Sequence, residues 1–183
     1  VWRTSFGFDM KLPLGIDLIA DFIYTKSLND IYQFDANMRP TDTVITFGDH
    51  DRAAFKTAAS RTYTSSVRNA MVLSNTNQGH GLSAAVTLNK NFKNGFNAFV
   101  SYAFNNTFDI TANPGSQANS AWSGNPNYGT TLGANQNTPM LGISQYSTPH
   151  RVVGSVSYKF EYAKHFATTI ALSYEGFNAG RFN

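Results

Sequence analysis

Cysteine is absent from this chain of 183 residues, and several other features that would identify common protein classes are missing as well. No run of roughly 18 apolar residues occurs, which excludes a transmembrane helix. Charged residues make up only 14% of the chain, whereas disordered chains combine high charge with few aromatic residues. Lys and Arg form no stripe or cluster, so the sequence does not favour nucleic-acid binding.

Motifs for catalysis or cofactor binding are also missing. The chain has no Gly-x-Ser-x-Gly elbow and no convincing Ser/His/Asp order, so we do not expect an enzyme. Asp49-His50-Asp51 is the only tight cluster of metal-ligand types, and no second ligand pair follows at metal spacing. Gly79-His80-Gly81 lacks the third glycine of a dinucleotide site and is interpreted as a loop or bulge. We therefore expect no metal ion and no other cofactor.

Aromatic residues, in contrast, are abundant, with 15 Phe, 9 Tyr and 2 Trp, and they recur with a period of two. In residues 2–10 the even positions are Trp, Thr, Phe, Phe and Met, and the odd positions are Arg, Ser, Gly and Asp. Successive residues of a strand point to opposite faces, so this pattern predicts a strand with one aromatic and one polar face. The same alternation predicts three hairpins, at about 2–25, 82–105 and 151–177.

The connections between the predicted strands are of two very different lengths. Links within the hairpins, such as the one containing Asn94-Gly95, have about five residues, typical of tight turns. Links between hairpins, at about 26–81 and 106–150, are roughly ten times longer. Alternate links of a meander lie at opposite ends, so all the long links share one end. Short turns at one end and long outer loops at the other are typical of outer-membrane barrels.

The sequence therefore predicts an all-β chain that forms an antiparallel transmembrane β-barrel segment. A soluble β-sandwich or adhesin is the alternative, although sandwich strands usually recur every ~8–12 residues with similar turns at both ends. Six strands are too few to close, since single-chain barrels need about eight. We therefore expect residues 1–183 to be a single partial domain of a larger barrel. Small polar residues opposite the aromatic face favour a wide barrel.

The strand residues resemble those of TonB-dependent outer-membrane receptors. The likeness lies in WRTSFGFD (2–9), LPLGIDL (12–18), YTK (24–26), VLSNTNQG (72–79) leading into 82–92, STPHRV (147–152) and SYEGFN (173–178). It is strongest to large members that carry a carboxypeptidase-regulatory-like N-terminal domain, related to the SusC-like importers. The resemblance covers nearly the whole chain and consists of strand patterns, not catalytic motifs.

The resemblance implies a barrel of about 22 strands around a plug, in the outer membrane of a gram-negative bacterium. It further implies import of a large solute, such as an oligosaccharide, peptide or metal chelate, powered by the TonB–ExbB–ExbD complex through a part of the protein outside this chain. Membrane lipid, lipopolysaccharide and possible surface lipoproteins are the other implied partners. A non-transporting surface adhesin and a passive porin remain alternatives that the strands alone do not separate from an importer.

The two long loops differ in composition. The first has balanced acids and bases, a short strand expected at 44–47 and a helical turn expected at 53–59. The second is almost uncharged and rich in Asn, Gly, Ser, Thr and Gln, with aromatic residues Trp122, Tyr128 and Tyr146. Aromatic rings among amides suit neutral polar ligands such as glycans or peptides, which makes these three residues candidates for ligand contact. The alternative is that the rings pack within the loop itself.

The two-residue period also makes a prediction about single side chains. Phe6, Val156, Ile170 and Leu172 should lie on one face of the sheet, which we expect to contact lipid. Phe99 should lie on the opposite face, towards the lumen or plug. A register error of one residue would exchange the two faces.

Overall fold

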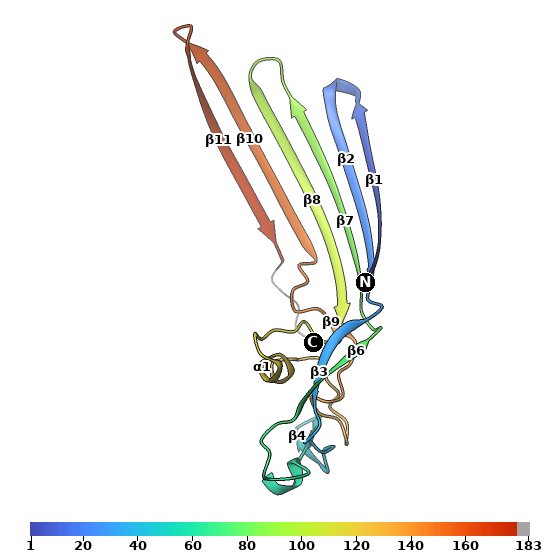
Figure 1. The fold of residues 1–183 in the computed structure, drawn as a ribbon. Helices are drawn as coiled ribbons and strands as arrows, with labels where there is room; N and C mark the ends of the chain where they lie inside the picture. The colour runs from blue at the N-terminus through green and yellow to red at the C-terminus, as the bar shows by residue number, and fades with distance from the viewer. Residues whose placement is uncertain (179–183) are drawn as a thin grey trace.

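Six long strands form one antiparallel sheet in the computed structural model, which describes residues 1–178 (Figure 1). They are β1 (Trp2–Leu12), β2 (Ile16–Lys26), β7 (His80–Asn91), β8 (Phe96–Asp109), β10 (His150–Tyr162) and β11 (Phe166–Phe177). Their order in the sheet is β1-β2-β7-β8-β10-β11, a meander in which sequence neighbours pair. The all-β antiparallel prediction is confirmed. The sheet is open, with β1 and β11 at its edges.

The three short turns lie together at one end of the sheet, and both long connections leave from the other end (Figure 1). Left-handed backbone conformations allow the chain to reverse within a few residues in each turn. They occur at Leu14 and Gly15 in the first turn, at Gly95 in the second, and at Ala163 and Lys164 in the third. Within residues 1–178 no helix is long and apolar enough to cross a membrane.

The turn at Asn94-Gly95 is attached to the neighbouring hairpin. The backbone N–H of Phe92 donates to the carbonyl of Phe96 at 2.8 Å, which closes the turn, and Gly95 has a φ of +85°. The carbonyl of Gly95 accepts a hydrogen bond from the N–H of Lys159 in β10 at 2.9 Å. A Cβ atom at position 95 would collide with the carbonyl oxygen of Lys159, so both the φ angle and the close approach require glycine.

The two long connections fold together into what we call the lobe, residues 27–79 and 110–149 (Figure 1). Its elements are β3 (Asp30–Asp35), β4 (Thr43–Phe47), β5 (His50–Ala54), the 3-10 turn η2 (Ala58–Arg61), β6 (Met71–Thr76), α1 (Ala118–Ser123) and β9 (Gly142–Ile143). β3 pairs with β6 and β4 with β5, while β9 extends the large sheet by pairing with the end of β8.

Local predictions within the first long loop have mixed outcomes. The short strand at 44–47 is confirmed as β4. The helical turn predicted for 53–59 is wrong, because Ala53 and Ala54 pair with β4, and the turn begins only at Ala58 after the cap residue Thr57. The interpretation of 79–81 as a loop or bulge is also corrected. Gly79 has a φ of +119°, but His80 and Gly81 already pair with β2.

Candidate functional site

The register of the six strands places the apolar side chains on one face, here called the apolar face. Residues paired across neighbouring strands point to the same side. Val156, for example, pairs with Ala98 and Leu172. The larger side chains of the apolar face include Phe6, Phe8, Met10, Leu18, Phe22, Leu82, Val86, Leu88, Val100, Tyr102, Val156, Tyr158, Ile170 and Leu172. All of the long strands' charged side chains except Lys26 and Lys90 lie on the other face.

That other face, the polar face, combines small residues with the charges. Its members include Ser5, Gly7, Asp9, Lys11, Asp17, Asp21, Ser83, Ala85, Thr87, Ser101, Ala103, Arg151, Ser155, Ser157, Lys159, Glu161, Ser173 and Glu175. Hydrogen-bonded contacts cross it, among them Thr87 Oγ1 to Ser101 Oγ at 2.7 Å and the ion pair Arg151–Glu175 at 2.7 Å. Phe99 pairs with Asn89 and Ser155, so the prediction that it lies opposite Val156 is confirmed.

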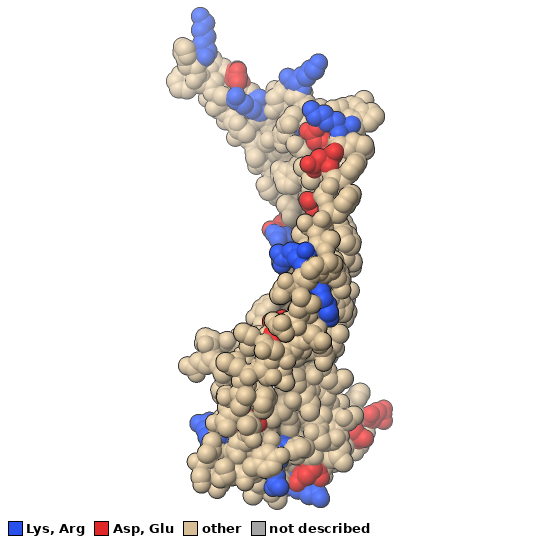
Figure 2. All heavy atoms as spheres, turned by 45° about the vertical axis from the view of Figure 1, so that its right-hand side comes forward, with Lys and Arg blue, Asp and Glu red and all other residues tan. Residues whose placement is uncertain are grey.

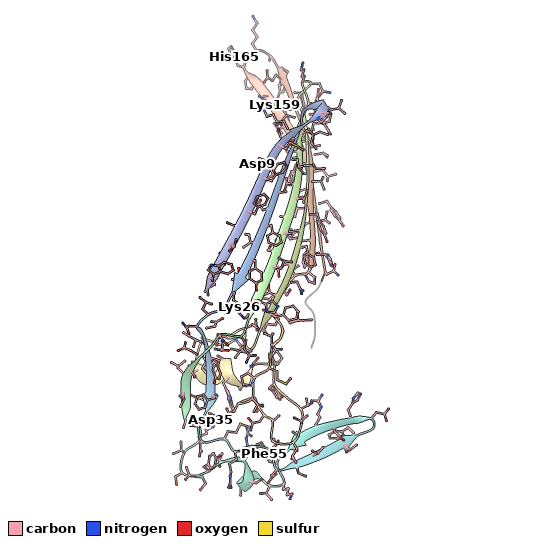
Figure 3. The ribbon with its side chains drawn as sticks, turned by 90° about the vertical axis from the view of Figure 1, so that its right-hand side faces the viewer. Asp9, Lys26, Asp35, Phe55, Lys159 and His165 are labelled. Carbon is pink, nitrogen blue, oxygen red and sulfur yellow. The ribbon has the colours of Figure 1, made fainter. Side chains whose placement is uncertain are left out.

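The two lysines on the apolar face mark its upper and lower limits. Lys26 lies where the sheet meets the lobe (Figure 3), and Lys90 lies near the short turns, where its Nζ is 4.5 Å from the centre of the Phe92 ring. Lys90 pairs with Ile16, so on β2 the two levels are ten residues apart (26 − 16), about 33 Å at ~3.3 Å per residue. If the strands were tilted by ~40°, as barrel strands are, this separation would correspond to a height of about 25 Å.

Aromatic rings gather at both limits of the apolar face. Near the short turns, the contacts are Phe92–Phe96, Tyr158–Phe160, Phe160–Tyr162 and Tyr162–Phe166, with ring centres 5.3–6.2 Å apart. Near the lobe, the contacts are Trp2–Tyr24, His80–Phe108, Tyr102–His150 and Phe104–His150. His150 also hydrogen-bonds through Nδ1 to the Tyr102 hydroxyl at 2.7 Å. Rings with one polar edge are favoured where an apolar layer meets water.

The lobe is held together by three short motifs that we call the Asx clips, residues 35–37, 125–127 and 135–137. In each, the side-chain oxygen of the first residue accepts a hydrogen bond from the backbone N–H two residues later, at 2.8–3.1 Å. Asp and Asn commonly form such turns. The clip residues Asp35, Asn37, Asn125, Asn127 and Asn135 are all buried. Their spacing, an Asp or Asn followed two residues later by Asn, is a sequence pattern that could have located the lobe's core.

Asn137 joins the two halves of the lobe. Its side-chain oxygen accepts from the backbone N–H of Asp35 at 2.8 Å and from the indole N–H of Trp122 at 2.9 Å. Its side-chain amide donates to the carbonyl of Asp35 at 2.7 Å. One side chain thus satisfies three polar groups, and two of them belong to a segment 102 residues earlier in the chain.

Asp35 is the buried charge of this network, with 2% of its surface exposed (Figure 3). Burial alone would raise its pKa. Hydrogen bonds from the backbone N–H groups of Ala70 and Asn37 and from the side chain of Asn69, at 2.8–2.9 Å, outweigh burial, and the charge of Arg61 adds to them. The pKa of Asp35 is therefore lowered, and the carboxylate stays ionised at neutral pH.

A cavity of about 630 Å³ lies between the two halves of the lobe. Its size is typical of a small-molecule site. The first loop contributes Arg52, Phe55 and Arg61 to its wall, and the second contributes Tyr128 and Gln136. None of its lining residues belongs to the six long strands.

The three aromatic residues predicted to contact a ligand lie in three different places. Trp122 is buried, with 5% of its surface exposed, and belongs to the interior of the lobe. Tyr128 is half-buried in the wall of the cavity just described. Tyr146 is 68% exposed and lines a second cavity of about 520 Å³, where the lobe meets the polar face. The structure does not bring the three rings into one site, and the sequence reasoning missed Arg52 and Arg61.

Asp49 lies in the exposed turn between β4 and β5, and His50 and Asp51 are the first two residues of β5. Asp51 accepts a hydrogen bond from the Thr46 hydroxyl at 2.6 Å. Among residues 1–178, no group of three His, Cys, Asp or Glu side chains is placed to hold a metal ion.

Comparisons of the chain with protein-family models, with curated proteins and with solved structures find no match.

Proposed function

We propose that this chain is part of an outer-membrane β-barrel that imports a large solute in a TonB-dependent manner. The observation that carries the proposal is the segregation of charge between the two faces of the sheet. An apolar face about 25 Å high, with charge only at Lys26 and Lys90 and rings at both limits, fits a surface that contacts lipid. Lipopolysaccharide and phospholipid would then be its immediate neighbours.

The polar face supports a water-filled or plugged interior. Its charges and its small side chains leave little bulk to fill a narrow barrel, whereas wide barrels accommodate water or a plug. The open sheet also fits a wide barrel, because the free edges of β1 and β11 would pair with further strands of the same barrel. The lobe would then lie at the outer mouth. Active import through TonB–ExbB–ExbD, instead of adhesion or passive diffusion, follows from the sequence resemblance.

Cysteine labelling of the full-length protein in its host tests the orientation. Leu132→Cys places a thiol in the lobe, and His165→Cys places one in the third short turn (Figure 3). In a background without other cysteines, a membrane-impermeant maleimide should label Leu132→Cys in intact cells. It should label His165→Cys only after the outer membrane has been permeabilised. Labelling of both positions in intact cells would contradict the proposed topology.

Uptake measurements test the transport step. Uptake of a labelled oligosaccharide or peptide by cells that produce the full-length protein should be lost when TonB is deleted. Uptake that persists without TonB would favour a passive porin. An absence of uptake together with binding of cells to host or matrix material would favour an adhesin.

A further inference from the structure

The cavity between the two halves of the lobe has an uneven distribution of charge. Arg52 and Arg61 line it, and no Asp or Glu does. The ion pairs found in residues 1–178 are Arg151–Glu175 and Lys159–Glu161, both in the sheet, so neither arginine has a carboxylate partner at ion-pair distance. Arg61 is close enough to Asp35 to stabilise its charge, yet Asp35 takes its hydrogen bonds from other donors. Figure 2 shows charged side chains at the far end of the lobe.

The opposite wall of the cavity carries no charge, because residues 110–149 contain no Asp, Glu, Lys or Arg. Tyr128 supplies aromatic surface on this wall, and Gln136 and Thr130 supply polar groups, while Phe55 adds a second ring from the first loop. The positive potential of the two guanidinium groups is therefore not cancelled by the facing segment. Guanidinium groups present several N–H donors in a planar arrangement that matches a carboxylate or phosphate.

Hydrogen bonds between the two loops hold the walls of the cavity in place. The N–H of Ala53, next to Arg52, donates to the carbonyl of Thr130 at 2.9 Å. The hydroxyl of Thr41 donates to the carbonyl of Ala134 at 3.0 Å and accepts from the N–H of Gly133 at 2.8 Å. A site whose walls are already ordered loses less conformational entropy when a ligand binds.

We infer that this cavity binds the anionic group of a solute, a carboxylate or phosphate, through Arg52 and Arg61. A ring or apolar part of the same solute lies against Tyr128 and Phe55. The cavity is lined by loop residues alone, whereas the apolar face belongs to the long strands. The inference rests on the proposed import for what happens to the solute after it binds. It adds to that proposal that the imported solute carries a negative charge.

Two probes that differ in one group test this inference. 4-Nitrophenyl β-glucuronide carries a carboxylate where 4-nitrophenyl β-glucoside carries a hydroxymethyl group, and the ring and the rest of the sugar are shared. Binding of each to the purified full-length protein in detergent is measured by calorimetry at low salt. The glucuronide should bind about tenfold more tightly. Because both arginines are exposed, added salt should reduce this preference.

Arg52→Gln and Arg61→Gln should each reduce the preference for the glucuronide by about three- to fivefold, with little change for the glucoside. Lys56→Gln is the matched control, because it removes an exposed cation of the same loop that does not line the cavity. Equal affinity for the two probes, or a preference that survives both arginine substitutions, would overturn the inference. These measurements do not involve TonB, so failure of the binding site and failure of the proposed import are distinguishable.

Discussion

The sheet and the lobe are stabilised in different ways. Among residues 1–178, no residue of the six long strands is buried, and every buried residue belongs to the lobe. The sheet is held by its backbone ladders and leaves large apolar side chains exposed, for instance Leu172 at 72%. The lobe has a small core in which Met38 and Trp122 pack among buried amides. The lobe thus covers its own core, whereas the sheet leaves one face of large apolar side chains exposed, which is typical of a surface that contacts lipid or another protein.

This difference predicts where each region is sensitive to substitution. Substitutions on the apolar face of the sheet should change stability by an amount that depends on the surrounding medium. Substitutions in the lobe should destabilise it through the loss of internal hydrogen bonds.

The largest effect is expected from Val156→Arg on the apolar face. Val156 lies near the middle of β10, so an arginine there should destabilise the proposed full-length barrel by about 2–4 kcal/mol in a bilayer. Ser155→Arg, one residue away on the polar face, should cost much less. The measurement is equilibrium refolding into vesicles of different thickness. Equal free-energy costs at the two positions, or costs that do not depend on bilayer thickness, would contradict the proposal that the apolar face contacts lipid.

The next effect is expected from Asn137→Ala in the lobe. The substitution leaves the indole N–H of Trp122 and the backbone N–H of Asp35 without the Asn137 oxygen that accepts from them. It also removes one of two donors to the Asp35 carbonyl, which keeps the N–H of Met38 at 3.1 Å. The loss should cost about 2–3 kcal/mol. Hydrogen exchange should show faster opening of the lobe and unchanged protection of the sheet. Gln136→Ala is the control, since no such network depends on the neighbouring side chain. Loss of protection in both regions would mean that the lobe and the sheet unfold as one unit.

A smaller effect is expected from Gly95→Ala in the second turn. The left-handed φ and the collision with the Lys159 carbonyl should together cost about 1–3 kcal/mol. Gly15→Ala is the matched control, with a φ of +70° but open space around the added methyl group, and it should cost less. Denaturant titration of the two variants measures the difference. If the two costs are equal, the contact between this turn and β10 contributes nothing.

The smallest effect is expected from acid, through the buried carboxylate of Asp35. Its folded-state pKa is lowered from 3.8, so protonation favours the unfolded lobe. The stability that Asp35 contributes is present above the unfolded-state pKa and is lost as the pH falls through the lower folded-state value. Hydrogen exchange of the lobe should therefore accelerate below about pH 4. Asp35→Asn should reduce this pH dependence to the part due to Asp42, whose pKa is also lowered, by a hydrogen bond from the N–H of Lys56, whereas Asp49→Asn at the exposed β4–β5 turn should leave it unchanged.

The sheet could be predicted from the sequence because its determinants are local. Alternation fixes which side chains share a face, and Asn94-Gly95 fixes a turn, so the face of Phe99 followed from its position alone. The predicted start of this strand at residue 82 was too late, because β7 begins to pair with β2 at His80. Gly79, one residue earlier, interrupts the alternation of apolar and polar residues.

The lobe could not be predicted in the same way because its determinants are distant in the sequence. Arg52 and Arg61 share a cavity with Tyr128 only because β5 docks onto the second loop through Ala53 and Thr130. The sequence left open whether Trp122 contacts a ligand or packs within the loop, and its burial and its hydrogen bond to Asn137 show that it is internal. The Asx clips carry a recognisable spacing, yet their partners cannot be derived from it.

The separation of 102 residues between Asp35 and Asn137 has a consequence for the order in which the molecule folds. Contacts between distant residues form after local ones, because the intervening chain loses entropy when it is closed into a loop. Each hairpin of the sheet can form from residues that are close in the sequence, whereas the lobe requires both long connections to be present at the same end of the sheet. We therefore expect the lobe to be the last part to acquire protection in pulse-labelling experiments, once β7 and β8 have brought the two connections together.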